Sequence, residues 1–392
     1  MQYSDEINNH SGRRKDYKKI ILILFICLFA VVMGVTITKN DANYNTDSVN
    51  NENIVNTTGV RRMLVNKVDK AVLNDNVYVK IGGTPIGISV NAGGLIVIGQ
   101  SEVVTENGTA DPASKSGLQV GDVIRSINGE DLTSIYQLKK ILETAEGAVK
   151  LSVMRDGQAF DTYITPALDK LTGQNRLGLM LKEDIGGVGT LTFVTQDGHF
   201  GALGHYIADA ESGLSYELNS GHIYSTSIDG VVKGERGKAG GLVADVNRLS
   251  APIGDINQNT DIGIYGTFSA DSDGELYKIA AKGEAMIGPA KVLTTVDGTQ
   301  PKFYDIDIVK VVSQSEAGEK GMVIAVRDKE LLEKTGGIVQ GMSGSPIVQN
   351  GVLIGAVTHV FVQDSTRGYA VHSRFMYDYA ISSNESAFIE AA

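Results

Sequence analysis

The hydrophobic pattern of the chain changes twice, and these changes divide it into three parts. An unbroken apolar run from Ile20 to Val35, extended by residues 36–38, follows a basic segment. After a polar stretch, short apolar runs begin at Val77 and continue almost to the C-terminus, separated by Gly, Asn and Asp. Short runs between turn residues are typical of β-strands. The pattern therefore predicts one apolar helix followed by β-rich globular regions.

The N-terminal part has the pattern of a membrane anchor. We predict a cytoplasmic tail at residues 1–19, a transmembrane helix at 20–38 and an Asn- and Thr-rich linker at 39–76. The apolar run is just long enough to span a bilayer. Its basic flank comes first, which predicts a cytoplasmic N-terminus and export of the remainder. A cleaved signal peptide is the competing interpretation, although no Ala-x-Ala site follows the run.

The first globular region, predicted at 77–168, carries clear turn and cap signals. A short helix is expected to end at Gly117, and Ser134 is a good N-cap for a second helix that reaches about Ala145. Asn-Gly at 128–129 and Asp-Gly at 156–157 are typical of hairpin turns. These signals predict a small domain with several strands and two helices.

Residues 113–129 read Ala-x-x-x-Gly-Leu-x-x-Gly-Asp-x-Ile-x-x-Ile-Asn-Gly, which resembles the signature of a PDZ domain. The resemblance implies a domain that binds a peptide as an added strand. It places the peptide-binding loop at Ile86, Gly87 and Ile88. The preceding Pro85 departs from the first Gly of a Gly-Leu-Gly-Phe type loop.

The second globular region, predicted at 169–392, consists of short strand-like runs without a visible repeat. Their number and spacing are typical of a barrel or a sandwich. The runs lie at 177–181, 188–195, 223–228, 243–246, 262–268, 285–287, 303–312 and 322–326.

The composition and the motifs argue against several classes of function. The net charge of -11 and the lack of a long basic block outside the N-terminus argue against nucleic-acid binding. The single cysteine, Cys27, lies in the apolar run and allows neither an intrachain disulfide nor a cysteine metal site. No His-Glu-x-x-His motif is present. We therefore expect no metal and no cofactor.

The most informative reactive residue is a serine in a glycine-rich turn. Residues 341–346 read Gly-Met-Ser-Gly-Ser-Pro, close to the Gly-x-Ser-Gly-Gly-Pro loop of chymotrypsin-like double barrels. This alignment selects Ser343 over Ser345 as the nucleophile. His205 precedes it in a β-rich region, which is the order of base and nucleophile in those barrels. The backbone amides of Gly341 and Ser343 are expected to form the oxyanion hole.

Longer segments resemble a single family. Gly-Ala-Leu-Gly-His at 201–205, Gly-Gly-Ile-Val-Gln-Gly-Met-Ser-Gly-Ser-Pro-Ile at 336–347 and Gly-Ala-Val-Thr-His-Val-Phe-Val at 355–362 are similar to the SpoIVB peptidases, peptidase family S55, of endospore-forming bacteria. The resemblance implies a serine endopeptidase in the forespore intermembrane space that cleaves itself near its N-terminus. It also implies cleavage of a membrane-bound regulator of an intramembrane protease, which activates a late mother-cell sigma factor.

The acid that orients the histidine stays open between several residues. The family resemblance points to Asp328 as the partner of His205. The order of residues in double barrels instead favours Asp261, with Asp209 and Asp245 as lesser candidates. An aspartate at a turn is also a common helix cap.

The sequence as a whole predicts a mostly β protein with a transmembrane helix, a PDZ-like domain and a chymotrypsin-like double β-barrel serine protease domain. The strand at 352–358 is expected to form a wall of the substrate cleft, and His359 to line the cleft or pack. The alternative is a binding scaffold, in which a PDZ module is joined to a catalytically inactive β-barrel.

Overall fold

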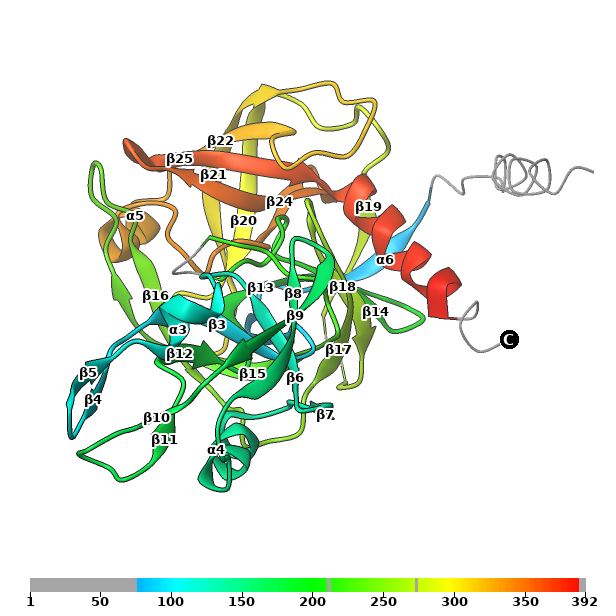
Figure 1. Ribbon diagram of the computed structural model, residues 1–392. Helices are drawn as coiled ribbons and strands as arrows, with labels where there is room; N and C mark the ends of the chain where they lie inside the picture. The colour runs from blue at the N-terminus through cyan, green and yellow to red at the C-terminus, as the bar shows by residue number, and fades with distance from the viewer. Residues whose placement is uncertain (1–75, 210–212, 272–273, 388–392) are drawn as a thin grey trace, which may run out of the picture. The chain divides into compact units, whose positions relative to one another are not determined.

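The computed structural model describes residues 76–209, 213–271 and 274–387 (Figure 1). These residues belong to one compact unit. The predicted membrane anchor at 20–38 lies outside the described residues. Within those residues, no helix is both long and apolar enough to cross a membrane.

Six antiparallel strands close into a first barrel, in the order β13-β14-β18-β17-β15-β2 and back to β13. Alternate side chains of a strand point to one face, so Ile86, Ile88 and Val90 all enter the barrel core. The strands are β2 (Pro85–Asn91), β13 (Ile185–Thr195), β14 (His199–Ala202), β15 (Ser220–Val232), β17 (Gly254–Thr260) and β18 (Gly263–Phe268).

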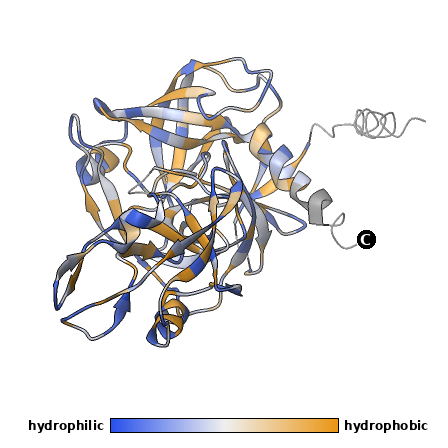
Figure 2. Cartoon of the chain, in the orientation of Figure 1, coloured by the Kyte–Doolittle hydropathy of each residue, from blue (hydrophilic) through white to orange (hydrophobic). Residues whose placement is uncertain are grey.

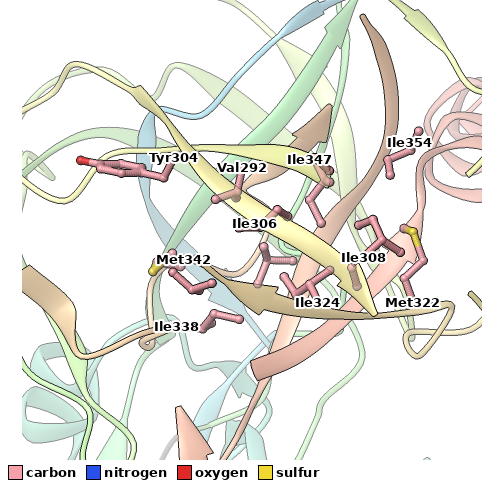
Figure 3. Packing of buried hydrophobic residues seen from close by; sticks show 14 of the residues in the cluster. Val292, Tyr304, Ile306, Ile308, Met322, Ile324, Ile338, Met342, Ile347 and Ile354 are labelled. Carbon is pink, nitrogen blue, oxygen red and sulfur yellow. The ribbon is translucent and has the colours of Figure 1, made fainter. Parts of the chain in front are cut away.

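A second barrel closes in the order β24-β23-β20-β21-β22-β25 and back to β24, again with antiparallel neighbours. Figure 3 shows its core, where Ile306, Ile324 and Ile347 belong to one buried cluster with Met342 from the loop before β23. The strands are β20 (Gly288–Thr294), β21 (Lys302–Val311), β22 (Met322–Val326), β23 (Pro346–Gln349), β24 (Val352–Phe361) and β25 (Asp364–His372).

Two short strands join the barrels into one sheet. Strand β1 (Tyr78–Ile81) pairs with β13 and with β19 (Leu276–Ile279), which pairs in turn with β24. Helix α6 (Ser373–Ala387) packs against β14, β18 and β24, so it contacts both barrels. The remaining elements of this part are β16 (Gly241–Val246), which pairs with β15, and α5 (Lys329–Thr335). The two rings of strands confirm the predicted double barrel.

The PDZ-like part forms a separate sheet in the order β12-β3-β6-β8-β9, with β7 beside β6 (Figure 1). Gly117 ends α3 in the left-handed conformation, and the hydroxyl of Ser134 accepts a hydrogen bond from an amide of α4, as predicted. Figure 2 shows α4 with hydrophobic and hydrophilic residues side by side, and Leu138 and Leu142 are its buried residues.

The PDZ-like elements have the following bounds. The sheet contains β3 (Leu95–Gln100), β6 (Val123–Ile127), β7 (Glu130–Asp131), β8 (Val149–Arg155), β9 (Gln158–Ile164) and β12 (Leu179–Lys182). Two hairpins pair β4 (Val103–Thr105) with β5 (Gly108–Ala110) and β10 (Ala167–Leu168) with β11 (Asn175–Arg176). The helices are α3 (Pro112–Ser116) and α4 (Ile135–Glu143).

The structure corrects the predicted boundaries of the two globular regions. Strands β1 and β2, predicted within the PDZ-like region at 77–168, belong to the sheet of the barrels. Strand β12, predicted within the protease region, pairs with β3 of the PDZ-like sheet. The PDZ-like part is therefore an insertion between β2 and β13.

Candidate active site

The loop that carries Ser343 is held by the neighbouring barrel. Gly341 and Gly344 have φ values of 96° and 93°, in the left-handed region that favours glycine. The amide of Thr190 donates to the carbonyl of Ser343 at 2.9 Å, and the Thr190 hydroxyl donates to the Gly341 carbonyl at 2.9 Å. The Thr192 hydroxyl donates to the Gly344 carbonyl at 2.7 Å. Strand β13 of the first barrel thus fixes the serine loop of the second.

The loop leaves two amides available for a developing negative charge. Within the described residues, neither the Gly341 amide nor the Ser343 amide donates a hydrogen bond. The Ser343 hydroxyl donates to the carbonyl of Thr358 on β24 at 2.7 Å. The Ser345 hydroxyl is buried and donates to the Thr294 hydroxyl at 2.9 Å. Ser345 therefore supports the loop, and the free amides lie beside Ser343.

His205 follows β14 on the opposite barrel. Its Nδ1 lies 2.7 Å from the carbonyl of Tyr206. A carbonyl can only accept a hydrogen bond, so Nδ1 carries the proton and Nε2 keeps its lone pair. Burial lowers the pKa of His205 below its usual 6.5, against the opposing effects of the Tyr206 carbonyl and of Glu319. The ring is therefore neutral at pH 7 and can act as a base through Nε2.

His205 and Ser343 line the same cleft, which has a volume of about 540 Å³. Leu242, Ile338 and Val360 are among its apolar lining residues. Among the described residues that line it, none is an aspartate, glutamate, lysine or arginine. The geometry thus places a neutral histidine and a serine in an uncharged cleft between the barrels.

Strand β24 forms one wall of this cleft, as the sequence predicted. Thr358, His359 and Val360 all line it. The ring centroids of His359 and His205 are 4.7 Å apart, with an angle of 38° between the ring planes. A second histidine therefore contacts the predicted base.

The structure does not bring Asp328 to His205. Asp328 is the N-cap of α5, and its carboxylate accepts hydrogen bonds from the amides of Leu331 and Asp305 at 3.1 and 3.4 Å. Asp261 is exposed in the turn between β17 and β18. In the described part of the chain, neither carboxylate contacts His205 by a hydrogen bond or an ion pair. The assignment of either residue as the catalytic acid stays a prediction.

The two lesser candidates have other surroundings. The buried carboxylate of Asp209 accepts a hydrogen bond from the ammonium of Lys182 at 2.9 Å. Asp245 is exposed on β16. The carbonyl of Tyr206, rather than a carboxylate, therefore sets the tautomer of His205 in this structure.

The cap at Asp328 leads to a prediction about stability. Asp328→Ala is expected to lower the free energy of unfolding by about 1 kcal/mol, the usual cost of a lost N-cap. Asp328→Ser retains a capping oxygen and should lose only a few tenths of that amount. Chemical denaturation of the two variants measures the difference. Equal stability of the alanine and serine variants would contradict a capping role.

The predicted peptide-binding loop of the PDZ-like region needs a correction. Ile86, Gly87 and Ile88 lie on β2, which pairs with β13 on one side and with β15 on the other. Strand addition requires an edge with unpaired backbone groups, and β2 offers none at these residues. Residues 113–129 belong to the PDZ-like part, but β2, which precedes them in the chain, belongs to the sheet of the barrels.

A better candidate for peptide docking lies at β12, which the sequence interpretation missed. Strand β12 is at one end of the PDZ-like sheet. It follows Leu177-Gly178, which resembles the middle of a Gly-Leu-Gly-Phe type loop. In the described chain, neither the Leu177 amide nor the Gly178 amide donates a hydrogen bond. The position of this Leu-Gly-Leu run after the last PDZ hairpin was the signal that could have identified it.

Helix α4 runs along the same segment. Near the end of α4, the side-chain amide of Asn175 donates to the carbonyl of Leu142 at 2.9 Å. At its start, the amide of Ile135 donates to the carboxylate of Glu183 at 2.7 Å. A helix beside an edge strand and a turn with free amides is the arrangement that receives an added peptide strand.

Comparison with known families agrees with the catalytic geometry. A model of the SpoIVB peptidase S55 family matches residues 173–377, which is slightly more than half of the chain. The chain belongs to the SpoIVB peptidase S55 family. The S55 match includes both His205 and Ser343. A PDZ domain model matches residues 103–155, inside the PDZ-like part.

Other proteins resemble parts of this S55 peptidase. It is 29% identical over 181 residues to a probable periplasmic serine endoprotease, DegP-like, of Pseudomonas putida strain W619, covering 45% of this chain and 33% of that protein. The corresponding protein of strain GB-1 is 30% identical, with the same coverage. The chain thus spans about a third of the length of these curated relatives. The family matches to the S55 peptidases and to the PDZ domain show a chain of a serine peptidase family with a PDZ domain.

Two solved structures are similar to parts of the chain. The PDZ domain of the SdrC-like protein from Listeria monocytogenes is 23% identical and covers 24% of this chain and 90% of that one, with a TM-score of 0.19. The Rv3671c protease from M. tuberculosis is 14% identical and covers 51% of this chain and 74% of that one, with a TM-score of 0.32.

Proposed function

We propose that this S55 peptidase is a membrane-anchored endopeptidase of sporulation signalling. Its substrates are a membrane-bound regulator of an intramembrane protease and its own N-terminal region, and cleavage activates processing of a late mother-cell sigma factor. The N-terminus lies in the cytoplasm and the barrels lie in the forespore intermembrane space. Family membership and the apolar run at 20–38 support this assignment. The observation that carries the peptidase reaction is the cleft shared by Ser343 and His205.

The reaction begins with a change in the hydrogen bond of the serine. Ser343 Oγ turns from the Thr358 carbonyl toward His205 Nε2 and attacks the scissile carbonyl as the imidazole takes its proton. The amides of Gly341 and Ser343 stabilise the oxyanion. His205 then gives its proton to the leaving amine, and water hydrolyses the acyl-enzyme by the same steps. The uncharged lining of the cleft suits apolar substrate side chains around the scissile bond.

The PDZ-like part supplies the contact with protein partners. We place the docked peptide along the free edge of β12, beside α4, with its terminal carboxylate at the amides of Leu177 and Gly178. The main-chain hydrogen bonds of an added strand provide affinity for any extended segment. This position lies in a different sheet from β2, where the sequence interpretation had placed it.

Labelling with a serine-directed phosphonate tests the peptidase function. The full chain is expected to react at Ser343, and His205→Ala should slow labelling by at least about 100-fold, because the general base is lost. Mass spectrometry of the labelled peptide identifies the serine. A wild-type chain that remains unlabelled and cleaves no peptide, yet binds its partner, would instead favour a scaffold with an inactive barrel.

The lowered pKa of His205 predicts the pH dependence of turnover. The base must be neutral, so kcat/KM falls on the acidic side as His205 becomes protonated. Because burial lowers its pKa, this fall should occur below pH 6.5, the usual pKa of histidine. A pH profile of kcat/KM on a peptide substrate checks this. An acidic limb centred above 6.5 would contradict the neutral base.

A further inference from the structure

We propose that Glu319, positioned by His359, stabilises the charged form of His205. The proposal rests on the roles of Ser343 and His205 in the proposed function. Among the described residues, neither Asp328 nor Asp261 makes a hydrogen bond or an ion pair with His205. A base that becomes cationic in the reaction needs a negative charge near it, and aspartate normally supplies that charge in serine peptidases.

Glu319 is attached to the strand that holds the nucleophile. It lies in the connection between β21 and β22, and its carbonyl accepts a hydrogen bond from the Thr358 hydroxyl at 3.0 Å. The carbonyl of the same threonine accepts the hydrogen bond of Ser343. Thr358 therefore fixes the glutamate connection relative to the serine.

The side chain of Glu319 faces the second histidine of the cleft. Its Oε2 lies 3.8 Å from Nδ1 of His359. That Nδ1 is buried and has no hydrogen-bond partner in the described residues. A buried polar atom without a partner is costly, and a closer approach of about 1 Å would give it a normal hydrogen bond. Glu319 is thus the acceptor that His359 lacks.

The ring of His359 links this carboxylate to the base. The His359 and His205 rings are in contact, with centroids 4.7 Å apart. The charged and titratable groups that act on His205 are His359 on β24 and Glu319 on the β21–β22 connection, and its Nδ1 bonds to the carbonyl of Tyr206. Lys320 also pairs with Glu319, 3.2 Å from its Oε1. The carboxylate of Glu319 raises the pKa of His205, whereas its burial and His359 lower it.

The pair acts only through His205 and does not touch the reacting atoms. When Ser343 Oγ bonds to the substrate carbonyl, its proton moves to Nε2 of His205 and the imidazole becomes cationic. The charge of Glu319 stabilises that cation, and a closer approach of its carboxylate to His359 Nδ1, 3.8 Å away, would hold it in place. The proton leaves again with the amine, so Glu319 and His359 end each cycle unchanged.

The matched variants are Glu319→Gln and Glu316→Gln in the full chain. Glu316 is an exposed glutamate in the same connection, and both substitutions remove one charge. Glu319→Gln keeps the backbone bond to Thr358, so its melting temperature should stay near that of the wild type. We expect at least about a tenfold loss of kcat/KM at pH 7, the factor equal to one pKa unit. Glu316→Gln should keep wild-type turnover.

The pH profile separates this role from a structural one. Loss of the Glu319 charge lowers the pKa of His205, so the acidic limb of kcat/KM should move to lower pH in Glu319→Gln. His359→Phe retains a ring beside His205 but removes Nδ1, and it should lose activity to a similar degree. Combining it with Glu319→Gln should add little, because both changes break the same interaction.

Wild-type turnover and an unmoved acidic limb in Glu319→Gln would overturn the proposal. So would a loss of activity in Asp328→Asn, which keeps the cap oxygen but not the charge, while Glu319→Gln remains active. Failure of the proposed function can be distinguished from failure of the Glu319 proposal. In that case the wild-type protein would show no phosphonate labelling, or the His205→Ala variant would keep its activity.

Discussion

Ser343→Ala is expected to abolish peptide hydrolysis in a protein that remains folded. Removal of the nucleophile in serine peptidases lowers kcat by about 10⁶-fold, and the amides of the oxyanion hole leave only a residual rate. The lost hydroxyl makes one hydrogen bond, to the Thr358 carbonyl, so the free energy of unfolding should fall by about 1 kcal/mol. Steady-state hydrolysis of a peptide, together with thermal melting, measures both effects.

Ser345→Ala is the matched control, because the two serines lie two residues apart in the same loop. The Ser345 hydroxyl is buried against Thr294 and does not line the cleft. Its loss should lower the free energy of unfolding by about 1–2 kcal/mol, as one hydrogen-bond partner is left unsatisfied. Most of the activity should remain. Full activity of Ser343→Ala and inactivity of Ser345→Ala would reverse the assignment.

Gly344→Ala should cause the largest loss of stability among single substitutions in this loop. A Cβ at this position would lie 2.1 Å from the carbonyl oxygen of Thr190 and 2.5 Å from the amide of Leu203. Both neighbours are backbone atoms of the other barrel, so relief requires the barrels to move apart. With the cost of a positive φ added, we expect a fall of about 3–5 kcal/mol in the free energy of unfolding.

Gly351→Ala separates the clash from the backbone strain. Gly351 also has a positive φ, of 78°, but a Cβ there meets nothing within 4 Å. It should therefore cost only about 1–2 kcal/mol. Denaturant unfolding of both variants measures the difference. Equal losses would mean that the contact between Gly344 and the first barrel does not limit the loop.

Local chemistry made several features predictable from the sequence. Glycine readily adopts the left-handed conformation that ends a helix, and serine readily caps the start of one. Gly117 and Ser134 were therefore assigned correctly as the end of α3 and the N-cap of α4. The serine turn could be recognised because the glycines and the proline around Ser343 are typical of a tight turn. The order of His205 and Ser343 then indicated two barrels, because each barrel supplies one of these residues.

Strand pairing was not predictable from local pattern. The run at 85–91 has the alternation of any half-buried strand, and nothing in it shows whether both of its edges will be paired. Its partners, β13 and β15, lie about 100 and 135 residues further along the chain. The acid was uncertain for a related reason, since the aspartate of a helix cap and that of a catalytic site look alike in sequence. Glu319 Oε2 and His359 Nδ1 lie 3.8 Å apart because the folding of the second barrel brings their segments together.

The insertion of the PDZ-like part also limits how the enzyme can be matured by cutting. Strands β1 and β2 precede the insertion, whereas their partners follow it. During synthesis, the first barrel must wait for the whole PDZ-like segment before it can close. A maturation cut that leaves the catalytic sheet in one piece must therefore fall before Tyr78 or after His372, and no single cut can release the PDZ-like part from an intact peptidase.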